Sequence, residues 1–179
     1  HRDMLQDVMW TNGYISAVAA HGEKVESCAR AFSMLGGAEL LDRMEHGVED
    51  VARTTLELLD SQPMKPGEYE CICTPEVTGM IAHEAFGHGV EMDMFVKDRA
   101  LAKQYIGKQV ASPLVTMHDG ASAAKETASY FFDDEGVLAH DTVVIDHGIL
   151  QQGISDSRSA QRLGTEPTGN GRREAFDHK

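Results

Sequence analysis

The sequence predicts a mixed α+β fold whose sheets are largely antiparallel. Two observations lead to this prediction: short segments of alternating apolar residues meet at glycine-containing turns, and two stretches carry apolar residues at helical spacing. One of these stretches predicts a long amphipathic helix, and the other predicts a helix that bears a histidine motif. A length of 179 residues, 41% of them hydrophobic, permits one or two domains with a sizeable core.

The first part of the chain is predicted to form a hairpin followed by the long helix. Strands over residues 14–20 and 24–34 flank His21-Gly22-Glu23, a polar break with glycine that is typical of a hairpin turn. Residues 38–60 carry the helical stripe, which we interpret as core packing and not as a cofactor site. Gly47 lies inside this helix at a cost of about 1 kcal/mol, which the apolar face can absorb.

The best boundary is Gln62–Gly67, which contains two prolines and a glycine. Residues 1–62 are predicted to be the C-terminal part of an N-terminal α/β domain, and residues 63–179 the first part of a second domain. A helix is expected to follow, with Thr74 as its N-cap and proline at its first position. The remaining predicted elements are strands at 68–73, 114–117, 129–132, 142–146 and 149–152, and a short helix at 155–163.

The most informative motif is His83-Glu84-Ala85-Phe86-Gly87-His88. Two neutral imidazoles can hold a zinc ion, and the adjacent carboxylate of Glu84 can take a proton from water bound to that ion. This is the hydrolytic chemistry of metalloproteases, so peptide hydrolysis is the leading hypothesis. The alternative is a helix with two ordinary histidines, because with nine histidines in the chain a chance match has a probability of roughly one in thirty.

The spacing of the two histidines is unusual. In the common motif they are four residues apart, which separates them by about 40° around a helix. Here they are five apart, so a regular helix would place them about 140° from each other and prevent chelation. Gly87 and Gly89 favour a widened turn, which restores the overlap of residues i and i+5. The sequence therefore predicts that the helix ends or bulges at Gly87.

The motif helix also carries an apolar stripe that is expected to pack on the core. Its residues are Val77, Met80, Ile81 and Ala85. His83 is predicted to point away from this stripe, where it is free to bind a ligand. Glu84 is predicted to lie close to it, where partial desolvation of the carboxylate suits general-base work.

Residues 83–93, HEAFGHGVEMD, resemble the zinc motif of the TldD/PmbA family of metalloproteases. They are more similar to the TldD-type subunit than to its TldE or PmbA-type partner, which lacks the full motif. The resemblance continues in the same order at Phe132–Gly136 and at Pro167–Arg173. It implies that the histidines of the motif are zinc ligands, that its glutamate is the general base, and that residues 63–179 open a metallopeptidase catalytic domain.

The resemblance further implies a cytoplasmic peptidase that cleaves peptides or unfolded protein segments. It would work beside a related TldE/PmbA-type subunit or as a homodimer, and older names link the family to modulation of DNA gyrase. The family's third zinc ligand is a cysteine that would lie beyond Lys179, so these 179 residues alone are expected to bind zinc weakly and to be inactive. Substitute ligands that the sequence does not distinguish are Cys71, Cys73, Glu91, Asp93, His118, His140 and His147.

Composition limits the partners of the chain. With 29 acidic and 16 basic residues the net charge is -13, which argues against direct binding to nucleic acid or to an acidic membrane surface. The sequence has no apolar run long enough to span a bilayer. Three cysteines are an odd number and fit a reducing compartment. Cys71 and Cys73 are expected to be buried in a strand, with a metal clip as the alternative.

Two further constellations leave alternatives open. Arg172 and Arg173 can bind a substrate carboxylate in a bidentate manner, although a rigid surface loop explains them equally well. Asp133-Asp134-Glu135 is predicted to be a solvated acidic turn and not a calcium site. The alternative to an enzyme is a non-enzymatic subunit that binds peptides or partners through its strand edges.

Overall fold

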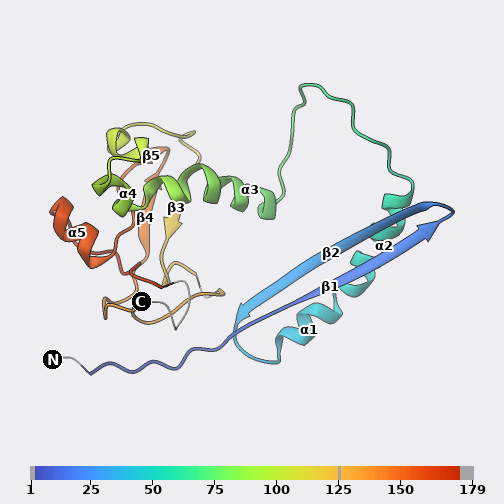
Figure 1. Cartoon of the computed structure of the whole chain (residues 1–179), viewed down its shortest axis with the longest axis horizontal. Coiled ribbons are helices and arrows are strands. Elements are labelled where there is room, and N and C mark those ends of the chain that lie inside the picture. Colours follow the sequence, from blue (N-terminus) through green and yellow to red (C-terminus); the bar gives the residue numbers. More distant parts are fainter. Residues whose placement is uncertain (1–2, 125, 174–179) are drawn as a thin grey trace. The chain divides into compact units, whose positions relative to one another are not determined.

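The computed structural model describes residues 3–124 and 126–173 (Figure 1). The chain divides into two compact units, one of which consists of Asp7–Glu70 and Glu126–Ala128, and the other of the remaining residues. Both units contain helices and antiparallel strands, so the predicted α+β class is confirmed. Within the described residues, no helix combines the length and the apolar character that crossing a bilayer requires. That the two units are parts of two domains of a longer protein stays a prediction.

The first unit is built on a hairpin of strands β1 (Trp10–His21) and β2 (Lys24–Leu35). The strands pair in register from Trp10 with Leu35 to His21 with Lys24. Gly22 lies in the turn with a φ of 62°, a conformation that glycine adopts without steric cost. The predicted hairpin is confirmed, with strands longer than expected.

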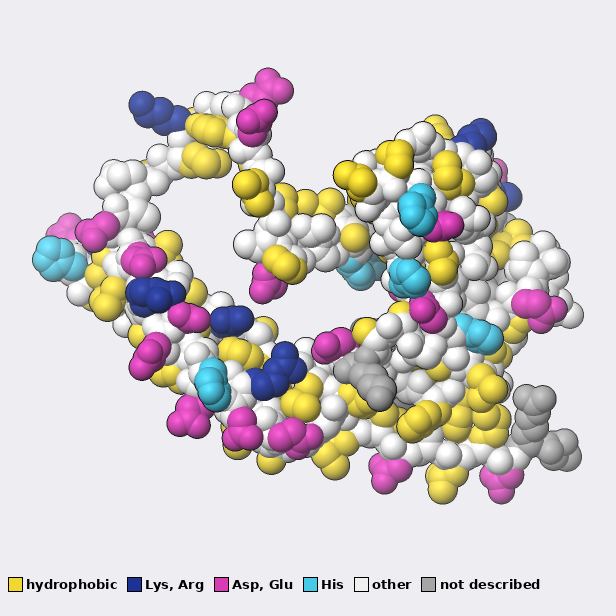
Figure 2. All heavy atoms as spheres, turned by 180° about the vertical axis from the view of Figure 1, so that it is seen from behind, with side chains coloured by type: hydrophobic (Ala, Val, Ile, Leu, Met, Phe, Trp, Pro, Cys, Tyr) yellow, Lys and Arg dark blue, Asp and Glu magenta, His cyan; other side chains and the backbone are white. Residues whose placement is uncertain are grey.

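Two helices pack on this hairpin, α1 (Leu40–Glu45) and α2 (Val48–Leu59), where the sequence predicted one. The single helix over residues 38–60 is therefore wrong, because the chain turns at Gly47. A Cβ atom at this position would lie 2.5 Å from Cζ of Phe32 in β2, so the backbone approaches the strand closely. Charged side chains of both signs lie along this unit in the view of Figure 2.

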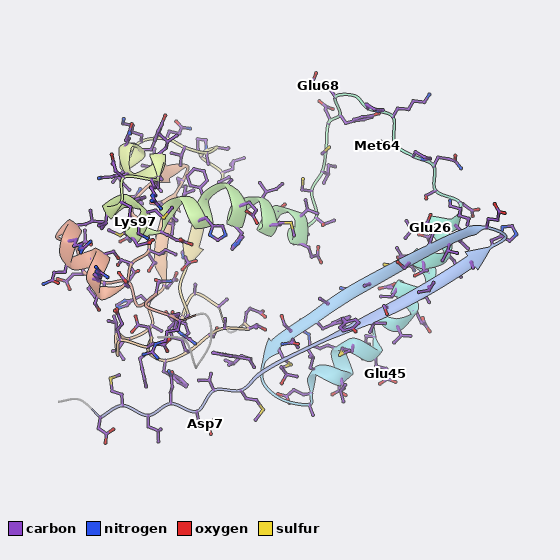
Figure 3. The ribbon with its side chains drawn as sticks, viewed as in Figure 1. Asp7, Glu26, Glu45, Met64, Glu68 and Lys97 are labelled. Atoms are coloured by element: carbon purple, nitrogen blue, oxygen red, sulfur yellow. The ribbon has the colours of Figure 1, made fainter. Side chains whose placement is uncertain are left out.

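Residues 61–74 form neither helix nor strand, and Figure 3 shows this segment around Met64 and Glu68. The predicted strand at 68–73 is therefore wrong, since no strand among the described residues pairs with it. Cys71 and Cys73 are exposed, which contradicts their predicted burial.

The second unit contains short helices around a small sheet. Its helical elements are α3 (Pro75–Ala82), η1 (His83–Gly87), η2 (His88–Val90), α4 (Met92–Val96), η3 (Leu101–Tyr105) and α5 (Ser157–Leu163). Its strands are β3 (Met117–Asp119), β4 (Thr142–Asp146) and β5 (Ile149–Leu150), which form an antiparallel sheet in the order β3-β4-β5. The predicted strand at 142–146 is confirmed, those at 114–117 and 149–152 overlap β3 and β5, and that at 129–132 is reduced to one bridge between Phe132 and Leu138.

The core of this unit lies where β4 and β5 meet the end of the motif segment. Its buried residues are Val90, Val144, Ile145 and Leu150. Phe86 from the histidine motif packs against this cluster. The predicted stripe on α3 does not, because Val77, Met80 and Ile81 are 49%, 67% and 53% exposed. Phe86 and Val90 thus attach the motif segment to the core, and the apolar stripe of α3 does not.

Candidate metal centre

The histidine motif occupies a π-helical turn, η1, between α3 and η2. Thr74 precedes α3 as its N-cap and Pro75 is its first residue, as predicted. The N–H group of His88 donates to the carbonyl of His83, which is the i to i+5 bond that defines a π turn. The predicted bulge at Gly87 is therefore confirmed. Such a turn places residues i and i+5 above one another, which an α-helix does not.

The turn brings the two imidazoles and the carboxylate together. One potential ligand atom from each of His83, Glu84 and His88 lies within 4.8 Å of the other two. The two rings meet edge to face, with their centroids 4.5 Å apart and an angle of 73° between their planes. Zinc bonds of about 2.1 Å in a tetrahedron bring ligand atoms to about 3.4 Å from one another, so small side-chain rotations suffice. The donor set and its spacing therefore fit a zinc ion.

Local packing explains why these side chains point outward. Val90 is buried in the core and the partly buried Phe86 packs against it, whereas all three potential ligands of the cluster are exposed. A Cβ atom at Gly87 would lie 3.4 Å from Nδ1 of His83, so the ring of His83 lies close to the backbone of Gly87. The expected desolvation of Glu84 is wrong for this chain, because the carboxylate is exposed and the apolar stripe beside it is not packed.

Other candidate ligands have different partners. Nδ1 of His88 lies 3.0 Å from Oε1 of Glu91, and Asp93 pairs with Lys97. Nδ1 of His118, in β3, lies 2.7 Å from Oδ1 of Asp141, the residue before β4. In residues 3–124 and 126–173, only His83, Glu84 and His88 form a group of three potential ligands. The sequence did not single out Glu91, although its position three residues after His88 is a signal for a helical contact.

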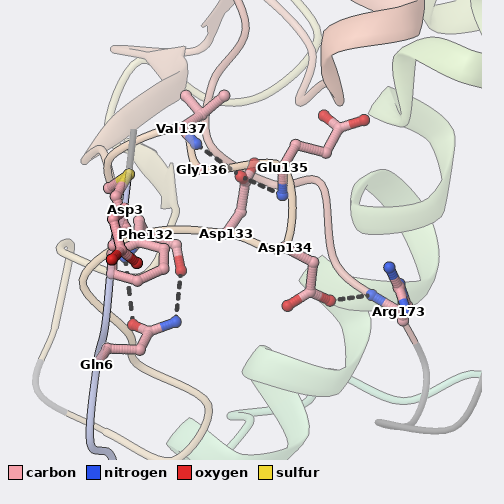
Figure 4. Close-up of a pocket in the computed structure, with 10 residues that line it drawn as sticks. Asp3, Gln6, Phe132, Asp133, Asp134, Glu135, Gly136, Val137 and Arg173 are labelled. Carbon is pink, nitrogen blue, oxygen red and sulfur yellow. Dashed lines mark hydrogen bonds between the residues drawn. The ribbon is translucent and has the colours of Figure 1, made fainter. Parts of the chain in front are cut away.

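The acidic motif is a turn in which Asp134 and Glu135 are exposed and Asp133 is buried (Figure 4). The Asp133 carboxylate, which is 1% exposed, accepts hydrogen bonds from the N–H groups of Glu135, Val137 and Gly171 at 2.9–3.0 Å. Asp134 accepts a hydrogen bond from the N–H of Arg173 at 2.8 Å. These bonds tie two motifs together across almost forty residues of sequence. The prediction of a solvated turn is therefore wrong for Asp133.

Arg172 and Arg173 lie beside a separate cavity of about 790 Å³, which is also lined by Glu91, Tyr130 and Asn170. The guanidinium of Arg172 lies 4.5 Å from the centre of the Tyr130 ring, and its Nε is 3.4 Å from Asp134. Burial raises the pKa of Tyr130 to about 12, so its hydroxyl stays protonated and donates to the carbonyl of Gly169 at 2.6 Å. The structure thus brings the arginines to a cavity whose wall includes Glu91, but not into the histidine cluster.

The fold and the motif together define a family of metallopeptidases. Residues 66–179 match the model of the PmbA/TldA metallopeptidase C-terminal domain, and the chain belongs to the PmbA/TldD family. A metalloprotease of Methanothermobacter thermautotrophicus is 32% identical over 163 residues, which are 89% of this chain and 35% of that protein. A TldD homolog of Haemophilus influenzae is 43% identical over 100 residues, 56% of this chain and 21% of that protein. The chain therefore spans about a third or less of the length of these relatives.

Solved structures show the same fold. TldE from Thermococcus kodakarensis superimposes with a TM-score of 0.75 at 20% identity, over 94% of this chain and 38% of that one. A Thermotoga maritima protein described as a candidate modulator of a DNA gyrase gives a TM-score of 0.72 at 23% identity, over 92% of this chain and 38% of that one. At these identities the likeness extends to the fold alone.

Proposed function

We propose that this chain carries the metal-binding part of a zinc-dependent peptidase that cleaves peptides or unfolded protein segments. The observation that carries the proposal is the π turn, which gathers His83, Glu84 and His88 into a cluster in a chain of a metallopeptidase family. A chance pair of surface histidines needs no such turn, whereas a shared ion requires the two rings to converge.

Each residue of the cluster has a proposed role. The imidazoles of His83 and His88 hold the ion, which supplies a Lewis acid for the peptide carbonyl. The carboxylate of Glu84 is close enough to both rings to act as the general base. It accepts a proton from the attacking water and returns that proton to the leaving amine. Its exposure allows water to reach it directly.

The surroundings of the cluster and the relatives of the chain support a proposed substrate and proposed partners. Arg172 and Arg173, at the cavity beside Glu91, are proposed to bind a carboxylate of the peptide. A related TldE/PmbA-type subunit or a second copy of the same chain is the proposed partner, supported by the structural likeness to TldE. The net charge of -13 supports a gyrase-related role only through protein and not through DNA. An odd number of cysteines, three, supports a cytoplasmic location.

Replacing Glu84 by glutamine tests the enzymatic proposal. The experiment uses a form of the protein that contains these residues and in which zinc-dependent cleavage of an unstructured peptide is detected. Glu84→Gln keeps the shape of the side chain but removes its basicity, so we expect cleavage to fall by at least about a hundredfold while zinc and peptide still bind. Glu126→Gln, outside the motif, is the matched control and is expected to cleave normally. Unchanged cleavage by Glu84→Gln would refute the role given to this residue.

A second function is favoured by the hairpin of the first unit. Within the described residues β1 and β2 pair only with each other, so each has an edge without a strand partner. Such edges can bind an extended peptide, which is the basis of a non-enzymatic peptide-binding or assembly subunit. Peptide binding without cleavage in every form of the protein, the Glu84 variant included, would favour this function over the peptidase.

A further inference from the structure

The carboxylate of Glu91 makes one contact that the metal cluster itself does not explain. Its Oε1 lies 3.0 Å from Nδ1 of His88, while both side chains remain partly exposed. Glu91 does not join the group of three ligand atoms, which among the described residues comprises His83, Glu84 and His88. It therefore contacts one candidate ligand, His88, without being a member of the cluster.

The backbone of Glu91 is held from both sides. Val90 and Met92 flank it and are buried, with exposures of 0% and 7%. The N–H of Met92 donates to the carbonyl of Ile154 at 2.9 Å, and the N–H of Ile154 donates to the carbonyl of Val90 at 3.0 Å. Glu91 itself is the N-cap residue of α4. Its carboxylate thus extends from a segment fixed to the core, next to a ring that lies on an exposed turn.

This contact selects one form of the imidazole. A neutral histidine carries a proton on one ring nitrogen only, and an ionised carboxylate can only accept a hydrogen bond. With Glu91 at Nδ1, the proton lies on Nδ1 and the lone pair of Nε2 points away from Glu91. We infer that Glu91 is a positioning residue that fixes the tautomer and the orientation of His88 so that Nε2 is presented to the metal. This inference rests on the proposed metal site.

A second pair in the same unit provides an internal control. His118 and Asp141 make the same type of contact, with Nδ1 and Oδ1 2.7 Å apart. His118 belongs to no group of three potential ligands among the residues that the structure describes. The carboxylate of Asp141, which contacts a histidine outside the cluster, can therefore be compared with that of Glu91, which contacts a proposed metal ligand.

The test uses the chain and its variants Glu91→Ala, Glu91→Gln and Asp141→Ala. Imidazole ¹⁵N chemical shifts of the metal-free protein, at mildly alkaline pH, report which nitrogen of His88 carries the proton. We expect Nδ1–H in the original chain, a shift toward Nε2–H in Glu91→Ala, and retention of Nδ1–H in Glu91→Gln, which keeps an oxygen acceptor. Asp141→Ala is expected to change His118 alone.

Zinc affinity is measured on the same proteins. Glu91→Ala is expected to bind zinc roughly 10–100-fold more weakly, Glu91→Gln to recover most of this loss, and Asp141→Ala to bind normally. An unchanged tautomer and affinity in Glu91→Ala would overturn the inference, and so would a loss as complete as that of His88→Ala, which would make Glu91 a ligand. If zinc leaves His83 and His88 of the original chain unaffected, the proposed metal site fails, and the tautomer comparison still decides whether Glu91 orients His88.

Discussion

At the scale of single residues, a buried carboxylate connects two of the sequence motifs. Asp133 lies in an acidic run that resembles a solvated turn, yet its carboxylate is buried under three backbone N–H groups. Buried carboxylates are tolerated when such donors satisfy them. The partner Gly171 lies 38 positions away in sequence, so local reasoning could not reveal the burial.

Asp156 gives a residue-scale prediction with a pH dependence. It caps α5, accepting a hydrogen bond from the N–H of Ser159 at 2.6 Å and another from the Ser159 hydroxyl. Partial burial raises the pKa of its carboxyl, but these hydrogen bonds outweigh that effect and leave the pKa below its ordinary value. Asp156→Ala is expected to lower the free energy of unfolding by about 1 kcal/mol at neutral pH.

The sign of the pH effect follows from the lowered pKa. The contribution of Asp156 is complete above the pKa of the unfolded state and is lost as the pH falls through the pKa of the folded state. Denaturant unfolding at neutral and acidic pH should therefore show the gap between the original chain and Asp156→Ala narrowing in acid. Asp98→Asn is the control, because it removes an exposed carboxylate that does not cap α5, at a φ of 56° that asparagine tolerates. It is expected not to reproduce the pH dependence of Asp156→Ala. A gap that widens in acid would refute this account of the cap.

At the scale of elements, the π turn could be predicted and the packing of α3 could not. Two histidines five residues apart cannot bind one metal ion on a regular helix, because they point in different directions. Their spacing and the adjacent glycines therefore predict a bulge. The apolar stripe of α3 has the correct helical spacing but lies exposed, since periodicity shows which face is apolar and not what covers it. The same limit applies to the long helix, whose break at Gly47 depends on the close approach of Phe32.

Lys24 gives the element-scale prediction. Its ammonium group donates to the carbonyls of Leu58, Leu59 and Ser61, at 3.2, 2.5 and 2.9 Å, and so caps the end of α2 from the first residue of β2. Lys24→Met keeps the length of the side chain but leaves these carbonyls without their charged donor. Hydrogen exchange of the amides in the last turn of α2 is expected to accelerate roughly tenfold, which corresponds to about 1.4 kcal/mol of local stability.

Lys65→Met, at an exposed residue in the segment after α2, is the matched control because it also removes one positive charge. It is expected to leave exchange in α2 unchanged. Equal exchange in the original chain and in Lys24→Met would show that water satisfies these carbonyls as well as the ammonium does.

At the scale of the whole molecule, the sequence sufficed for the fold class, the hairpin and the motif. The three ordered motifs indicated the family, which the match over residues 66–179 now shows. The sequence could not predict that the motifs Phe132–Gly136 and Pro167–Arg173 contact each other. That contact depends on hydrogen bonds from residues 171 and 173 to Asp133 and Asp134. The roles of Arg172 and Arg173 likewise stay a prediction, as do those of the three cluster residues.

The central claim is that the π turn makes His83 and His88 a single metal site. The most direct measurement is a zinc titration of the ¹⁵N-labelled chain, in which the imidazole resonances of all nine histidines are followed separately. We predict that the resonances of His83 and His88 shift together and at lower zinc concentrations than any others, and that replacing either residue by alanine abolishes the shift of the other. Independent shifts of these two histidines, or shifts of His118 or His147 at lower zinc concentrations than theirs, would contradict the account.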